Sequence, residues 1–87
     1  MGRELYSTRT FERLYERIPK QIQAQAIDKL DLYLRDPSHP SLRVKRMSGT
    51  ERIWELSVTM QYRITFELGG EKVILRRIGT HDILKSP

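Results

Sequence analysis

The segment at residues 53–81, IWELSVTMQYRITFELGGEKVILRRIGTH, decides the fold because it reads as three consecutive strands. Apolar and polar residues alternate over residues 61–68, which is typical of a half-buried strand. The Gly-Gly pair at 69–70 predicts a tight hairpin turn, because glycine accepts positive φ angles without strain. Residues 53–58 form an earlier strand, and residues 72–78 are apolar on both faces, as expected of a central strand. We therefore expect an antiparallel sheet in this half of the chain.

Two helices are predicted upstream of this segment. A first stripe of apolar residues recurs at i, i+3, i+4 and i+7, namely Phe11, Leu14, Tyr15 and Ile18. Thr8 or Thr10 can cap the N-terminus of this helix. Pro19 ends it and suits the first position of a second helix that runs to Asp36, with Ala26 or Ile27 on its apolar stripe. Two helices joined so tightly should form an antiparallel hairpin that covers one face of the sheet.

The remaining segments complete an α+β domain. Residues 3–7 predict a short edge strand, and the proline-rich run at 36–40 predicts a helix stop followed by a turn. Alternation over residues 42–47 predicts a half-buried strand with a basic outer face. The predicted order is β-α-α-β-β-β, with a helical hairpin on one face of a small, mostly antiparallel, twisted sheet. We expect residues 1–87 to form a single domain.

The composition excludes several classes of protein. The chain of 87 residues has no cysteine, which excludes disulfides, thiolate zinc sites and a cysteine nucleophile. No run approaches the roughly 20 apolar residues of a membrane span, and the first 18 residues are too charged for a signal peptide. We therefore expect a soluble, cytoplasmic protein that does not contact membranes.

Positive charge is concentrated on the predicted strands. Residues 42–77 hold eight Lys or Arg against four Glu, whereas residues 1–41 are nearly balanced. This distribution favours a sheet that faces a polyanion. A basic surface that only keeps the protein soluble explains the composition equally well.

Strand alternation brings three chemically useful residues together. If the apolar residues of the strands face the helices, Glu55 and Arg63 share the opposite face. His81 follows the last strand and can lie beside them if that strand pairs with either neighbour. Lys45, Arg76 and Arg77 could complete a basic rim.

This trio suits cleavage of RNA by its own 2′-hydroxyl. The reaction needs a base for the hydroxyl, a cation for the charge on the phosphorane, and an acid for the departing 5′-oxygen. A carboxylate, a guanidinium and an imidazole fill these roles without a metal. The simpler interpretation is that Glu55 and Arg63 form a cross-strand salt bridge with no catalytic role.

The sequence also resembles the RelE/ParE superfamily of bacterial toxins from type II toxin–antitoxin systems. The resemblance extends over nearly the whole chain. Its closest local matches are residues 39–42 (HPSL) with Lys45 after them, residues 54–56 (WEL), residues 62–64 (YRI) and residues 78–82 (IGTHD). The order and spacing of these matches carry the resemblance.

The resemblance implies a function and a set of site residues. RelE-like members are ribosome-dependent endonucleases that cut mRNA in the A site, without a metal or other cofactor. Arg63 matches the sheet arginine that stabilises the transition state. His81 lies where members carry an arginine or histidine after the last strand, and it is the expected general acid. Glu55, the expected base, lies at a strand position that holds lysine in some members, whereas others use a glutamate base nearby in the fold. The residues expected to hold ribosomal or messenger RNA are Arg43, Lys45, Arg46, Arg76 and Arg77. The expected partners are a cognate antitoxin, the ribosome and mRNA.

The sequence departs from the family pattern at two points, and these keep two other functions open. Many members carry an aromatic residue shortly after the His81 position, but the tail at 82–87 has none. Ser57 stands where some members carry a second catalytic basic residue. One alternative is a ParE-like toxin that binds and inhibits DNA gyrase without RNase activity. Another is a catalytically degenerate member that binds only its antitoxin.

Overall fold

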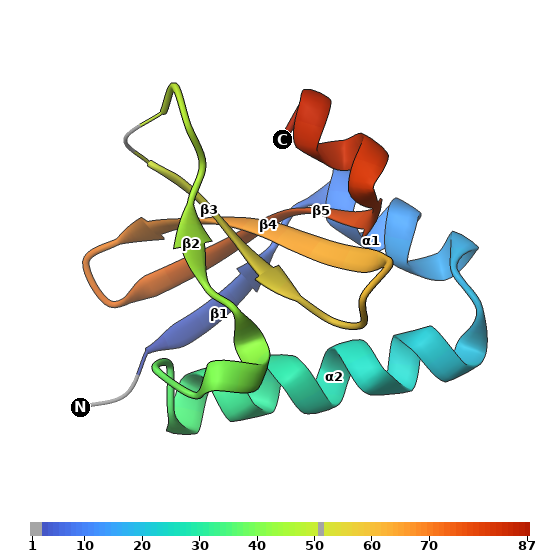
Figure 1. Ribbon diagram of the computed structural model, residues 1–87, viewed down its shortest axis with the longest axis horizontal. Helices are drawn as coiled ribbons and strands as arrows, with labels where there is room; N and C mark the ends of the chain where they lie inside the picture. Colours follow the sequence, from blue (N-terminus) through green and yellow to red (C-terminus); the bar gives the residue numbers. More distant parts are fainter. Residues whose placement is uncertain (1–2, 51) are drawn as a thin grey trace.

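The computed structural model describes residues 3–50 and 52–87, which form a five-stranded sheet and two α-helices (Figure 1). In chain order the elements are β1 (Glu4–Ser7), α1 (Arg9–Arg17), α2 (Lys20–Arg35), the 3-10 turn η1 (Pro40–Leu42), β2 (Lys45–Arg46), β3 (Ile53–Ser57), β4 (Tyr62–Gly69), β5 (Lys72–Thr80) and the 3-10 helix η2 (His81–Lys85). The strand order is β1-β5-β4-β3-β2, with β1 parallel to β5 and the other pairs antiparallel. The predicted α+β class, edge strand and helical pair are confirmed.

Local signals set the two helices where the sequence predicted them. Of the two possible caps of α1, Thr8 is the one used, and its hydroxyl accepts a hydrogen bond from the Phe11 amide at 3.1 Å. Pro19 occupies the cap position of α2, one residue before the helical position predicted for it. Because proline has no amide hydrogen, it adds no unsatisfied donor of its own, although no side chain caps the first amides of α2.

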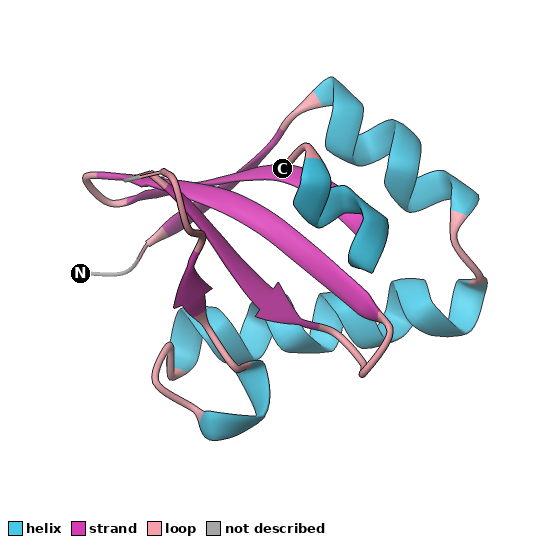
Figure 2. Ribbon diagram, turned by 45° about the horizontal axis from the view of Figure 1, so that its top comes forward, coloured by secondary structure: helices cyan, strands magenta, loops and turns pink. Residues whose placement is uncertain are grey.

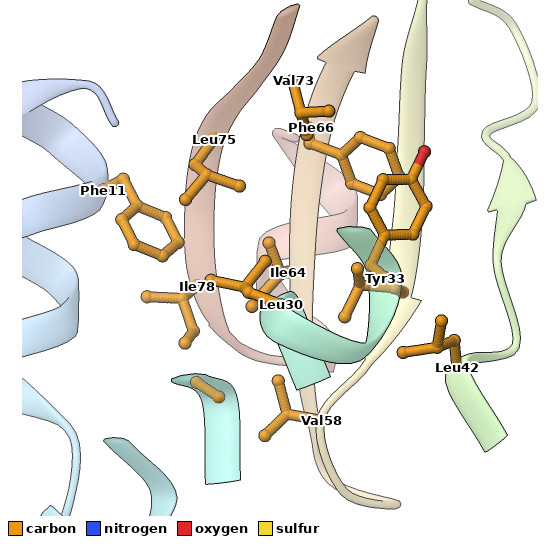
Figure 3. Close-up of a cluster of buried hydrophobic side chains, with 12 residues drawn as sticks. Phe11, Leu30, Tyr33, Leu42, Val58, Ile64, Phe66, Val73, Leu75 and Ile78 are labelled. Carbon is orange, nitrogen blue, oxygen red and sulfur yellow. The ribbon is translucent and has the colours of Figure 1, made fainter. Parts of the chain in front are cut away.

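The hydrophobic core lies between the helices and one face of the sheet (Figure 3). Tyr33 of α2 and Phe66 of β4 meet at its centre, with ring centroids 5.2 Å apart. Ala26 is fully buried whereas Ile27 is 53% exposed, which settles the position of the apolar stripe on α2. This core fixes which face of each strand points away from the helices.

The predicted strand over residues 42–47 is wrong for four of its six residues. Only Lys45 and Arg46 pair with β3, while Leu42 ends the 3-10 turn η1 and is fully buried. Arg43 adopts a left-handed conformation with φ of 49°, and its amide donates to the Pro40 carbonyl at 3.2 Å. A left-handed residue interrupts the alternation of a strand, so Arg43 does not belong to the basic strand face.

The second face of the sheet is partly covered, although the sequence predicted an open surface there. The C-terminal segment folds back as η2 over this face (Figure 2). Thr65 is fully buried beneath it and donates a hydrogen bond to the Pro87 carbonyl at 3.2 Å. Gly79 permits this packing, because a Cβ atom at that position would lie 2.8 Å from the Cγ2 atom of Ile83. The tail therefore forms one wall of any site on this face.

Among the described residues, no helix is both long enough and apolar enough to cross a membrane.

Candidate active site

Strand register places the candidate residues on the face opposite the helices. In the pairing of β3 with β4, Glu55 lies opposite Thr65 and Ser57 lies opposite Arg63. On the other side of β3, Lys45 of β2 lies opposite Glu55. Because residues that lie opposite each other in a sheet share one face, all five side chains belong to the same surface.

A pocket of about 340 Å³ opens on this surface. It is lined by Arg43, Lys45, Glu55, Ser57, Arg63, His81 and Leu84. All three residues predicted to act on the substrate therefore meet in one pocket, together with two of the five predicted RNA-binding residues. His81 lies near Arg63 because it directly follows β5, and β5 pairs with β4, the strand that carries Arg63.

Arg63 is held at one corner of its guanidinium group. Its Nη1 atom donates to three carbonyl oxygens in or beside the β3–β4 turn, those of Thr59 at 2.6 Å, Met60 at 2.9 Å and Tyr62 at 3.2 Å. Its side chain is only 12% exposed. A guanidinium group has donors on three nitrogen atoms, so this anchoring leaves the others available to an anion in the pocket.

Glu55 is the buried carboxylate of the site. Its Oε1 atom lies 3.7 Å from the Nε atom of Arg63, and its side chain is 8% exposed. This separation is within ion-pair range but too long for a hydrogen bond. The predicted cross-strand pair of Glu55 and Arg63 is therefore present, at the floor of the pocket.

His81 occupies the rim of the pocket and is exposed. Its Nε2 atom lies 3.4 Å from the Met60 carbonyl oxygen, which also accepts from Arg63. The imidazole and the guanidinium therefore contact the same backbone atom. An exposed imidazole beside a fixed cation can reach a substrate from outside while the cation holds it from within.

The other predicted RNA-binding residues lie elsewhere. Arg46 pairs with Trp54 in the strand register, which places it on the opposite face from Lys45. Arg76 donates to a Glu67 carboxylate oxygen at 2.6 Å and to the Pro87 carbonyl at 3.0 Å. With Arg77 it lines a separate pocket beside the start of α1. The structure does not bring these three arginines to the pocket that holds His81.

Two lining residues were not among the predicted site residues. Ser57 is 8% exposed and lies on the pocket wall, where it leaves room beside Arg63. Leu84 reaches the pocket only because η2 folds back over the sheet. The alternation of β3 predicts Ser57 on the same face as Glu55, whereas no local signal in the tail indicates where Leu84 packs.

The chemistry of the pocket is that of an anion site with proton donors and acceptors. Three permanent cations, Arg43, Lys45 and Arg63, face one carboxylate, so the lining is positively charged. Within residues 3–50 and 52–87, no three His, Cys, Asp or Glu side chains lie close enough together to hold a metal ion. Such a lining can bind a phosphodiester and exchange protons with it.

Comparison with protein families gives one match. Residues 20–82 match the family described as the ParE-like toxin domain. This range includes α2 and all five strands except β1, and it ends just after His81. A search of curated proteins gave no match.

Several solved structures share the fold. YafQ from Escherichia coli BL21(DE3) is 14% identical, with a TM-score of 0.77 and coverage of 94% of this chain and 97% of that chain. YafQ in the E. coli DinJ–YafQ toxin–antitoxin complex is 12% identical, with a TM-score of 0.80 and coverage of 97% and 98%. A chain of the RelB–RelE antitoxin–toxin complex from Methanococcus jannaschii is 18% identical, with a TM-score of 0.76 and coverage of 93% and 95%. At these identities the likeness is one of fold.

Proposed function

Because the chain belongs to the ParE-like toxin domain family, we propose that this toxin is a metal-free endoribonuclease that cleaves mRNA in the ribosomal A site and so inhibits translation. The observation that carries the proposal is the single pocket lined by Glu55, Arg63 and His81. A base, a phosphate-binding cation and an acid are the groups that cleavage by a 2′-hydroxyl requires.

In the proposed reaction the RNA supplies its own nucleophile. The Glu55 carboxylate takes the proton of the 2′-hydroxyl as the O2′–P bond forms. His81 gives a proton to the 5′-oxygen as the P–O5′ bond breaks. The products are a 2′,3′-cyclic phosphate and a 5′-hydroxyl, and one proton enters and one leaves the protein in each cleavage.

Arg63 stabilises the charge that develops between these two proton transfers. Its Nη1 atom is fixed by three carbonyl oxygens, so the guanidinium does not have to reorganise when negative charge builds on the phosphorane. Lys45 and Arg43 add positive charge at the mouth of the pocket and attract the phosphodiester chain.

Single-turnover cleavage of mRNA on stalled ribosomes tests these roles. We expect Glu55→Gln and His81→Ala each to lower the rate by about 10²- to 10⁴-fold, the usual contribution of a general base or acid. Arg63→Lys keeps the charge but loses the planar fork, and we expect a loss on the order of 10²-fold. Arg35→Ala removes an exposed arginine that pairs with Asp31 on α2, and is the matched control. Full activity of all three site variants would remove the basis of the proposal.

A second candidate function is inhibition of DNA gyrase, which the ParE-like description of the matching family favours. In that case Arg63 and Glu55 serve only to brace the β3–β4 turn, as their contacts with backbone and with each other allow. A supercoiling assay with purified gyrase distinguishes the two functions. Inhibition that survives both His81→Ala and Arg63→Lys, with mRNA intact, would favour the gyrase inhibitor.

We also propose that a cognate antitoxin binds this toxin. The structures of similar fold include the DinJ–YafQ and RelB–RelE toxin–antitoxin complexes. The excess positive charge of the chain, +5 overall, suits an acidic partner that lays a helix or strand over the basic surface. Co-expression with the product of an adjacent gene for a small acidic protein should yield a stable complex and relieve toxicity. An isolated gene with no such neighbour would count against this partner.

A further inference from the structure

A second pocket, of about 190 Å³, adjoins the candidate active pocket. The two share three lining residues, Arg43, Ser57 and Arg63. The other residues that line the second pocket come from α2, η1 and the β3–β4 turn. Helix α2 contributes Lys29, and η1 contributes Ser41. None of the described side chains that line this second pocket is acidic. The two pockets are therefore adjacent and share one wall, which includes two arginines.

Lys29 is a cation of the second pocket that does not line the candidate active pocket. Within residues 3–50 and 52–87 it is the only lysine that is not exposed, and its Nζ atom donates to the Ser41 hydroxyl at 3.2 Å. It forms no ion pair with any residue in the described part of the chain. Because this hydrogen bond is exposed and Lys29 lines the pocket, its ammonium group is accessible to an anion there.

The loop between α2 and β2 holds the pocket in shape. The Ser41 hydroxyl lies 2.9 Å from the Nδ1 atom of His39, and that atom also accepts the Ser41 amide at 3.2 Å. Directly after this turn, Arg43 takes its left-handed conformation. A non-glycine residue in that conformation is strained, and such strain is most often retained where a side chain must point in a particular direction. Here that side chain lines both pockets.

We infer that the second pocket binds the RNA phosphate adjacent to the scissile one, through Lys29, Ser41 and Arg43. This inference rests on the proposed endoribonuclease function. Single-stranded RNA carries one phosphate per nucleotide, so two basic pockets that share a wall match two successive phosphates. A lone phosphate would fill only one of them. Arg63 and Arg43 lie between the two positions, where they can contact either phosphate.

Binding of a trinucleotide whose 2′-hydroxyls are methylated tests this subsite without any cleavage. Lys29→Met keeps the length of the side chain but removes its charge. We expect about fivefold weaker binding and a salt dependence, log Kd against log salt, that is smaller by about 0.7, the value for one phosphate contact on a single strand. Lys29→Arg should retain most of the affinity. Lys20→Met, on the exposed start of α2 and outside both pockets, is the matched control and should bind like the unmodified protein.

A methylphosphonate linkage at the adjacent position completes the test. We expect it to weaken binding to the unmodified protein and to have no further effect on Lys29→Met, because both changes remove the same contact. Equal affinity and salt dependence of Lys29→Met and the unmodified protein would overturn the subsite, even if mRNA is cleaved. Lys29-dependent binding with no cleavage of mRNA on ribosomes would support the subsite and overturn the proposed enzymatic function instead.

Discussion

Lys45 and Arg46 are neighbouring exposed cations on β2, and the alternation of the strand sends them to opposite faces of the sheet. Lys45 lines the candidate active pocket, whereas Arg46 lies opposite Trp54 on the other face. We expect Lys45→Ala to raise the KM for ribosome-bound mRNA about fivefold to tenfold, because it removes one contact with the phosphodiester chain. Arg46→Ala removes the same charge from the same strand and should leave KM unchanged. Equal effects of the two changes would indicate a general effect of charge instead.

Met60 lies beside His81, near which many family members carry an aromatic residue that this chain lacks. Its side chain is 86% exposed at the tip of the β3–β4 turn, and it lines a shallow pocket with His81. A flexible thioether can pack on the face of a base as an aromatic ring does, though less rigidly. We expect Met60→Ser to lower the cleavage rate several-fold, and Met60→Phe to retain it. An unchanged rate for Met60→Ser would show that this side chain does not contact the substrate.

At the scale of elements, the packing of η2 on β5 positions both His81 and Leu84. The space between Gly79 and Ile83 is too small for a methyl group, so Gly79→Ala must displace η2 or bend β5. We expect this variant to lose about 1–3 kcal/mol of unfolding free energy in urea, together with most of its cleavage activity. The double variant Gly79→Ala/Ile83→Ala removes the clash and should regain part of both. Failure of the second change to restore anything would place the role of Gly79 elsewhere.

The elements also show which parts of the structure the sequence could predict. The strands β3 and β4 were predicted because their alternation is local, and this alternation placed Glu55 and Arg63 on one face. Strand β5 was predicted because its residues are apolar on both faces. The fold of the tail was not predicted, because the hydrogen bond of Thr65 with Pro87 joins residues 22 positions apart in the sequence. The turn at Arg43 was missed because a left-handed arginine leaves no mark in a pattern of apolar residues. The role of Lys29 was not predicted either, because its position outside the apolar stripe of α2 is that of an ordinary solvated residue.

At the scale of the whole molecule, Tyr33 joins α2 to the sheet and to the N-terminal segment. Its ring packs on Phe66, and its hydroxyl accepts a hydrogen bond from Arg3 Nη1 at 2.7 Å. Burial raises the pKa of the Tyr33 hydroxyl above its usual value of 10.0, and the neighbouring Arg3 opposes this in part. The folded state therefore favours the neutral phenol, a contribution that is complete below pH 10 and is lost as the pH rises through the folded-state pKa.

Tyr33→Phe isolates this contribution. We expect the variant to be less stable than the unmodified protein at pH 7, where the hydrogen bond with Arg3 is lost, and the difference to shrink as the pH rises above 10. Urea unfolding followed by circular dichroism across this range measures it. Parallel stability curves for the two proteins would contradict the assignment to Tyr33.

The central claim is that Arg63, Glu55 and His81 form an RNA-cleaving site rather than a braced turn. Primer extension on a reporter mRNA after induction of the toxin without its antitoxin tests it most directly. We predict new 5′ ends within codons at the ribosomal A site, and their disappearance with Arg63→Lys or His81→Ala while Arg46→Ala still produces them. Growth arrest with an uncut message, insensitive to both site variants, would contradict the claim.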